Sequence, residues 1–213
     1  MKKVFYIITI ILLNSCQDDK IEGTWVGDYT YPTNYQNGDV VLPLQKLMRF
    51  KNGKAFYKGS KNNFGKESIE GDYSILSKNI KFKETFEKYR IKLVTNDSLV
   101  LINNSSSFVQ ILRRLPDTLK NDKNLKLIGN KYNWENKKFS DQIFFRNDSI
   151  LNRKSNYGSN SNGIHWERAE FNGFDIIFMD GDVPYIIDES KDESIILWTY
   201  NKELLEHKFK KIK

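Results

Sequence analysis

The sequence predicts an all-β protein, an antiparallel meander that forms two tandem small barrels behind an N-terminal export signal. Three observations carry this prediction. Short runs alternate apolar and polar residues with a period of two, clusters of Asn, Gly, Asp and Ser separate the runs, and the second half of the chain repeats the strand pattern of the first. Hydrophobic residues make up 39% of the 213 residues, which is enough to build packed cores and argues against disorder.

The N-terminus has the pattern of a secretory signal peptide. Lys2 and Lys3 give it a positive start, and an apolar run of ten residues from Val4 to Leu13 follows. Ten residues of helix rise about 15 Å, which is half of the roughly 30 Å hydrocarbon thickness of a bilayer, so the run is too short for a stable transmembrane helix. We therefore expect residues 1–15 to be a signal peptide that is removed on export.

The signal ends in Leu13-Asn14-Ser15-Cys16. This order of an aliphatic, a variable and a small residue before a cysteine resembles the lipobox of bacterial lipoproteins. The resemblance implies cleavage before Cys16, diacylglycerol on its thiol and often a further acyl chain, such as palmitate, on its amino group. Cys16 is the only cysteine in the chain and has no disulfide partner, which agrees with lipidation. An ordinary secretory signal beside a free cysteine is the alternative.

Residues 16–20 are the expected lipidated tether. Within it, Gln17-Asp18-Asp19 resembles the acidic export tags that follow the lipidated cysteine in surface lipoproteins of Bacteroidota. As an export tag, this segment implies a body that faces outward from the outer membrane. As a plain acidic tether, it leaves the body in the periplasm. In both cases the expected location is the cell envelope, with the lipid anchor in the outer membrane.

The charge distribution argues against nucleic-acid binding. The formal net charge is +7, but most of the lysines are scattered singly through polar positions. A nucleic-acid interface would need basic residues clustered on one face with interleaved aromatics. The one dense basic stretch is the C-terminal tail, with Lys208, Lys210, Lys211 and Lys213, and it would attract anionic lipid headgroups weakly.

The body opens with a half-buried strand and a hairpin. The first predicted strand, 24–31, places Trp25, Tyr29 and Tyr31 on one face and polar residues on the other. Asn52-Gly53 follows a second alternating run and is a pair favoured at the centre of a type I′ hairpin turn. The intervening Pro32 to Asp39 is expected to be a loop.

Further strands follow at regular spacing. They are marked by inward-facing apolar residues at alternate positions: Ile80/Phe82, Tyr89/Ile91/Leu93, Leu99/Leu101 and Val109/Ile111. The C-terminal segment 204–212 fits either a strand or a short amphipathic helix. We favour a strand because this segment matches 109–115 in the internal repeat.

The repeat predicts two domains. The matched pairs of segments are Ile21–Trp25 with Leu127–Tyr132, Met48–Asn52 with Phe144–Asp148, Ser98–Leu101 with Ser194–Leu197, and Val109–Leu115 with Glu206–Ile212. Domain 1 is therefore expected over 21–115 and domain 2 over 127–213. The polar segment 116–126 is the expected linker, because its opening Pro-Asp pair cannot continue a strand ladder. A single barrel is the alternative, but some fifteen predicted strands are too many for one soluble barrel.

Gly23-Thr24-Trp25 at the start of this meander resembles the first-strand Gly-x-Trp of lipocalins. The whole body resembles the small lipocalin-like domains of Bacteroidota lipoproteins. This resemblance implies two tandem lipocalin-like barrels, with Trp25 as a structural plug at the closed end of the first. Tyr132 stands at the corresponding position of the second.

The sequence contains no motif for catalysis or for a cofactor. A zinc site would need four closely spaced ligands, whereas the body has only His165 and His207 and no cysteine. His165 is expected on the solvent face of its strand. The acids at 180–182 and 188–193 lack the ligand order of an EF-hand and are interpreted as turn and edge-protecting residues. No cofactor and no metal are expected.

Aromatic residues near loops are the remaining functional hint. Five candidates for contact with a ligand or partner lie in or beside Gly/Asn-rich segments: Tyr31, Tyr35, Phe64, Tyr157 and Trp166. Packing of loop ends is the alternative. We therefore predict a non-enzymatic envelope binding module for a small apolar or glycan ligand or a protein partner. The alternatives are a purely structural or assembly lipoprotein, and a hydrolase whose carboxylates converge only in the folded protein.

Overall fold

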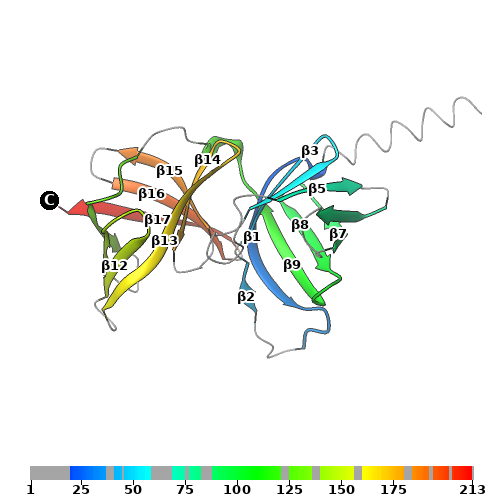
Figure 1. Ribbon diagram of the computed structural model, residues 1–213, viewed down its shortest axis with the longest axis horizontal. Coiled ribbons are helices and arrows are strands. Elements are labelled where there is room, and N and C mark those ends of the chain that lie inside the picture. The colour runs from blue at the N-terminus through cyan, green and yellow to red at the C-terminus, as the bar shows by residue number, and fades with distance from the viewer. Residues whose placement is uncertain are drawn as a thin grey trace, which may run out of the picture. The chain divides into compact units, whose positions relative to one another are not determined.

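The computed structural model describes residues 20–36, 41–44, 46–58, 69–74, 77–82, 88–120, 125–135, 140–155, 160–179, 184–191, 194–201 and 203–212. The predicted signal peptide, most of the tether and Cys16 lie outside these ranges. The described residues divide into two compact units, one ending at Leu115 and the other beginning at Pro116 (Figure 1). The predicted fold class is confirmed, because both units are antiparallel β-barrels.

Unit 1 is a meander closed by its first and last strands. Its strands are β1 (Gly23–Pro32), β2 (Leu42–Pro43), β3 (Leu47–Lys51), β4 (Lys54–Lys58), β5 (Ile69–Ser74), β6 (Asn79–Phe82), β7 (Lys88–Val94), β8 (Ser98–Asn103) and β9 (Phe108–Arg114). From β3 onward each strand pairs with its neighbour in sequence, and the pairing of β1 with β9 closes the ring. The short β2 lies on the same edge of β1 as β3, farther along the strand.

Unit 2 is also a closed meander. It contains the short 3-10 helix η1 (Asp117–Leu119) and the strands β10 (Lys131–Glu135), β11 (Ser140–Phe145), β12 (Ile150–Ser155), β13 (Ser161–Phe171), β14 (Phe174–Met179), β15 (Tyr185–Lys191), β16 (Ser194–Asn201) and β17 (Glu203–Ile212). β10 pairs with both β11 and β17, which closes the barrel. The C-terminal segment is therefore a strand, as we favoured.

The first strands of the two barrels pair with their neighbouring strands in an equivalent register. In unit 1, Trp25 lies opposite Met48 and Arg114. In unit 2, Tyr132 lies opposite Ile143 and Lys211. This supports the internal repeat, but it moves one matched segment by a residue: Met48 corresponds to Ile143 and not to Phe144. The turn after β11 is longer than the Asn52-Gly53 turn, so alignment by turn residues shifts the register.

The Asn52-Gly53 hairpin has the predicted geometry. Asn52 has φ 50° and Gly53 has φ 74°, and a type I′ turn requires positive φ at both central residues. These two residues connect β3 and β4, where Lys51 pairs with Lys54.

Two β-bulges overturn parts of the predicted alternation. In β1 the register shifts between Gly27 and Tyr29, so Tyr29 and Tyr31 face away from the side that carries Trp25. In β7 it shifts between Ile91 and Leu93, and Leu93 is half exposed although an inward position was predicted. One extra residue in a strand reverses the faces of all the residues that follow it.

Each barrel has its own apolar core. The core of unit 1 includes Trp25, Phe50 and Tyr89, and the core of unit 2 includes Tyr132, Phe145 and Phe209. Aromatic rings in contact run through both cores, for example Phe50 with Tyr73 and Tyr132 with Phe145. Aromatic contacts therefore extend through the core of each barrel.

Trp25 lies near the start of β1 and belongs to the core of unit 1. Its indole is fully buried, and its Nε1 donates a hydrogen bond to the Ile21 carbonyl at 2.8 Å. The Arg114 guanidinium lies 4.2 Å from the indole centroid and donates to the carbonyls of Lys20 and Glu22. Gly23 has φ 126°, and a Cβ there would lie 2.5 Å from Arg114 Nη1. The positive φ favours glycine at this position, and a Cβ there would also force the Arg114 guanidinium to shift.

Candidate functional site

Two of the predicted contact residues lie together at the end of β1. The rings of Tyr31 and Tyr35 meet edge to face with centroids 5.4 Å apart, and Tyr29 stacks on Tyr31 at 6.0 Å. Tyr35 is 42% exposed, whereas partial burial raises the pKa of the Tyr31 phenol. Two other candidates, Phe64 and Tyr157, lie outside the described residues.

Trp166, the remaining candidate contact residue, is buried and not open to a partner at the surface. Trp166 lies within β13 and is only 4% exposed. Its ring meets Phe145 edge to face at 4.7 Å, and its Nε1 donates a hydrogen bond to the Asn147 carbonyl at 2.9 Å. The long β13 carries the chain past the Gly/Asn-rich segment and into the core, so the ring packs inside the barrel instead of in a loop.

The inner face of barrel 2 carries a group of polar and aromatic side chains that sequence reasoning missed. We call this group the inner polar cluster. It takes one residue from each of six strands that are neighbours around the barrel, β15, β16, β17, β10, β11 and β12. In that order its members are Tyr185, Thr199, His207, Trp134, Asp141 and Arg153.

Asp141 and Arg153 form the charged part of this cluster. The Asp141 side chain is 0% exposed, and its Oδ2 accepts a hydrogen bond from Arg153 Nε at 2.6 Å. Its second oxygen, Oδ1, has no hydrogen-bond partner among the described residues. Arg153 is 41% exposed, and its guanidinium lies 5.4 Å from the centroid of the Trp134 ring. The arginine therefore connects a buried carboxylate with the protein surface.

Three rings form the aromatic part. His207 meets Trp134 at 5.4 Å and Tyr185 at 5.6 Å between centroids, both at steep angles. Burial lowers the pKa of the His207 imidazole, which favours its neutral form. Its Nε2 is buried without a hydrogen-bond partner in the described structure, and the same holds for the hydroxyl of the buried Thr199. The cluster thus contains donors and acceptors that the described protein leaves unpaired.

The equivalent positions of barrel 1 carry different chemistry. Counted from the matched Trp25 and Tyr132, they are Gly27, Lys46, Tyr57, Tyr89, Asn103 and Gln110. Lys46 stands at the position of Asp141 and donates a hydrogen bond from Nζ to the Tyr89 hydroxyl at 2.7 Å. The same ammonium lies 5.0 Å from the ring centroid of Tyr57. The two barrels therefore hold buried charges of opposite sign at one equivalent position.

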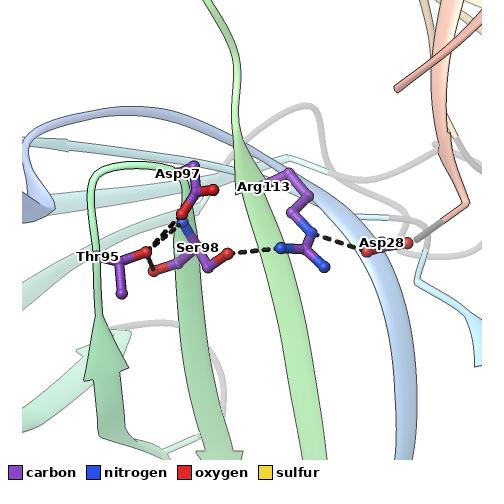
Figure 2. Close-up of polar contacts among 5 residues, drawn as sticks. All are labelled: Asp28, Thr95, Asp97, Ser98 and Arg113. Atoms are coloured by element: carbon purple, nitrogen blue, oxygen red, sulfur yellow. Dashed lines mark hydrogen bonds and ion pairs between the residues drawn. The ribbon is translucent and has the colours of Figure 1, made fainter. Parts of the chain in front are cut away.

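A second polar network joins three strands of unit 1 (Figure 2). Arg113 on β9 donates from Nε to Asp28 Oδ2 on β1 at 2.9 Å and from Nη1 to Ser98 Oγ on β8 at 2.6 Å. In the turn before β8, hydrogen bonds from the side chains of Thr95 and Ser98 lower the pKa of the Asp97 carboxyl. These contacts connect strands and turns, and we interpret them as structural.

The described ranges contain no group of three or more His, Cys, Asp or Glu side chains arranged to hold a metal ion. Asp188 accepts a hydrogen bond from Trp198 Nε1 at 2.9 Å, while the acids at 180–182 and 192–193 fall outside those ranges. His165 is exposed on β13. Within the described ranges, no helix is long and apolar enough to cross a membrane.

A weak signal for the inner polar cluster was present in the sequence. Thr199 continues the alternation of Ile195 and Leu197, so period-two counting already puts its hydroxyl on the inner face of β16. Asp141 similarly alternates with Ile143 and Phe145. That the six residues of the cluster converge could not be predicted from the sequence, because they are spread from position 134 to position 207.

No protein-family model matches the chain, and neither a curated protein nor a solved structure gives a match.

Proposed function

We propose that this protein is a non-enzymatic binding module of the cell envelope, in which the inner polar cluster of barrel 2 holds a small ligand. One observation carries the proposal: Asp141 Oδ1, Thr199 Oγ1 and His207 Nε2 are buried on the inner face of one barrel without hydrogen-bond partners in the described structure. Leaving such groups unpaired costs roughly 1–3 kcal/mol each. A ligand that pairs with them would recover much of this free energy.

The composition of the cluster favours binding over hydrolysis. Hydrolysis of a glycoside generally uses two carboxylates on either side of the scissile bond. The inner polar cluster contains one carboxylate, Asp141, and Arg153 already pairs with it. We therefore assign no catalytic residue and no cofactor.

The proposed anchor is the lipid on Cys16. Two or three acyl chains, at about 0.8 kcal/mol per buried methylene, would hold the protein at a membrane permanently, whereas one chain would bind only marginally. The acidic tag-like segment after Cys16 and the lipobox support a location in the outer membrane, with the body facing outward or into the periplasm.

A docking role without a ligand inside the barrel is the second candidate. It is favoured by Tyr35 and by the half-exposed Leu42 of β2, which together leave apolar surface open near the end of β1. Its partner would be another protein of the envelope. In that case the lipoprotein would have a structural or assembly role.

Native mass spectrometry of the protein purified from its own host tests the binding proposal. We expect an adduct on the wild type that is lost in the double variant Asp141→Leu with Arg153→Met. Replacing both partners by apolar residues of similar size removes the charges while keeping the packing. A wild type that carries no adduct, or a double variant that keeps the adduct, would overturn the proposal.

A further inference from the structure

We infer that the inner polar cluster of barrel 2 takes a neutral polyhydroxyl ligand, such as a sugar ring, in preference to a fatty chain or an ion. This inference rests on the proposed function, namely that a small ligand enters this barrel, and it adds the chemical class of that ligand.

The first argument is charge. Asp141 and Arg153 lie in direct contact and carry opposite charges, so the pair as a whole is neutral. A small ion beside the pair would be attracted by one member and repelled by the other, so the pair offers no strong net attraction to either sign of charge. A neutral ligand with hydrogen-bonding groups suits such a pair.

The second argument is the set of hydrogen-bonding groups. Asp141 Oδ1 can only accept, the Thr199 hydroxyl can donate and accept, and the Arg153 guanidinium has further N–H groups beyond those that contact Asp141. A sugar hydroxyl donates one hydrogen bond and accepts others, so adjacent hydroxyls match this mixture. A fatty chain would leave Asp141 Oδ1 unpaired and buried, at the cost already described.

The third argument is the route of entry. Arg153 is the charged member that reaches solvent, and its guanidinium covers one face of Trp134, while Phe209 stacks on the indole at 5.3 Å. The guanidinium is therefore the part of the cluster that a ligand arriving from solvent meets first, and it can donate to a ligand hydroxyl while it stays paired with Asp141.

Barrel 1 provides an internal comparison. Gly27 replaces Trp134 there, and a Cβ at Gly27 would lie 2.1 Å from the Leu44 carbonyl oxygen, so no ring fits at that position. Lys46 replaces Asp141 and brings a buried positive charge. We therefore assign the sugar site to barrel 2 alone.

The test is a binding panel on the full mature chain, solubilised in a detergent that has no sugar headgroup. The probes are glucose, galactose, N-acetylglucosamine, maltose and cellobiose, compared with decanoate and choline, by isothermal titration calorimetry. We expect at least one saccharide to bind, and decanoate and choline to leave the protein unchanged. Decanoate binding with no saccharide binding would overturn the sugar assignment but keep the binding module. Binding of none of the probes would overturn the sugar assignment, while the native mass spectrum decides separately whether barrel 2 holds any ligand.

The Thr199→Val variant tests whether the saccharide contacts this residue, and it is not expected to disrupt the fold. The Thr199 hydroxyl has no partner in the described structure, so valine should leave the ligand-free protein at least as stable as the wild type and weaken saccharide binding by about 3- to 10-fold, the value of one hydrogen bond. Thr30→Val is the matched control, because Thr30 Oγ1 donates to the Val109 carbonyl in the other barrel at 2.9 Å. It should leave affinity unchanged. Equal affinity in wild type and Thr199→Val would place the site elsewhere and overturn the inference.

Discussion

At the scale of single residues, Trp25 is the most heavily contacted side chain that the sequence analysis singled out as structural. It combines full burial, a hydrogen bond to Ile21 and the Arg114 guanidinium above its ring. We expect Trp25→Ala to lower the free energy of unfolding by about 3–5 kcal/mol, as measured by urea denaturation. Trp198→Ala removes an equally large but half-buried indole and should cost only about 1–2 kcal/mol. Equal losses in the two variants would contradict the predicted structural role of Trp25.

His207 predicts a pH dependence of stability. Burial lowers the pKa of its imidazole in the folded protein, so below about pH 6.5 the unfolded chain binds more protons than the folded one. The free energy of unfolding should therefore fall as pH drops through 6.5, by at most about 1.4 kcal/mol per pH unit for this one group, and level off below the folded pKa. Urea denaturation at pH 7.5 and 5.5 measures this difference.

The matched pair for this experiment is His207→Phe with His165→Gln. The first variant should lose part of the decrease between the two pH values, because phenylalanine binds no proton. The second replaces the exposed histidine of β13 and should keep the wild-type decrease. If His207→Phe shows the same pH dependence as the wild type, then His207 is not the group responsible.

At the scale of elements, the Arg113 network joins β1, β8 and β9, where the meander of unit 1 closes (Figure 2). Asp28 is 0% exposed at its side chain and Arg113 is 23% exposed. Arg113→Met would leave the buried carboxylate without this cation, and we expect a loss of about 3 kcal/mol in urea denaturation. The double variant Asp28→Leu with Arg113→Met should recover part of it.

Lys54→Gln is the control for that series. Lys54 on β4 contacts Asp72 on β5, but both side chains are well exposed, so solvent screens the pair and stability should change little. If Arg113→Met proved as mild as Lys54→Gln, the ion pair would not be what joins these strands.

The elements also show what could be predicted from the sequence. The Asn52-Gly53 turn was predictable because its conformation depends on two adjacent residues and the glycine lacks a Cβ. The bulge after Gly27 was not, because it depends on the pairing of β1 with β9, far away along the chain. Because the bulge was not predicted, the sequence analysis placed Tyr29 and Tyr31 on the same face as Trp25, whereas they face away from it.

The candidate site was harder to predict for the same reason. Trp166 stands beside a Gly/Asn-rich segment, and local composition suggested exposure, whereas the length of β13 decides that it packs on Phe145. The Asp141–Arg153 pair joins neighbouring strands and also depends on register. Local signals give the strands, but the contacts between strands decide which polar residues meet inside a barrel.

At the scale of the whole molecule, the two barrels share one strand register but differ in the polar side chains on their inner faces. Trp25 and Tyr132 occupy the same register position, and Leu101 and Leu197 are both buried at another. The inner charge is nevertheless reversed, with Lys46 in one barrel and Asp141 in the other. The backbone register depends on the apolar positions, so a polar inner position can carry a side chain of either charge without altering the strand order. If the proposed binding function is right, the two barrels should therefore differ in the ligands they accept.

The anchor itself gives the last prediction. If Cys16 carries two or three acyl chains, Cys16→Ala should move the protein from the membrane fraction to the soluble fraction and abolish incorporation of radiolabelled palmitate. The binding properties of barrel 2 should not change, because its core residues begin at Leu127. Asn14→Gln is a suitable control, since it alters the variable position of the lipobox-like segment and keeps both Ser15 and the thiol. A Cys16→Ala protein that still sediments with membranes would mean that something other than a lipid on this residue holds the molecule at the envelope.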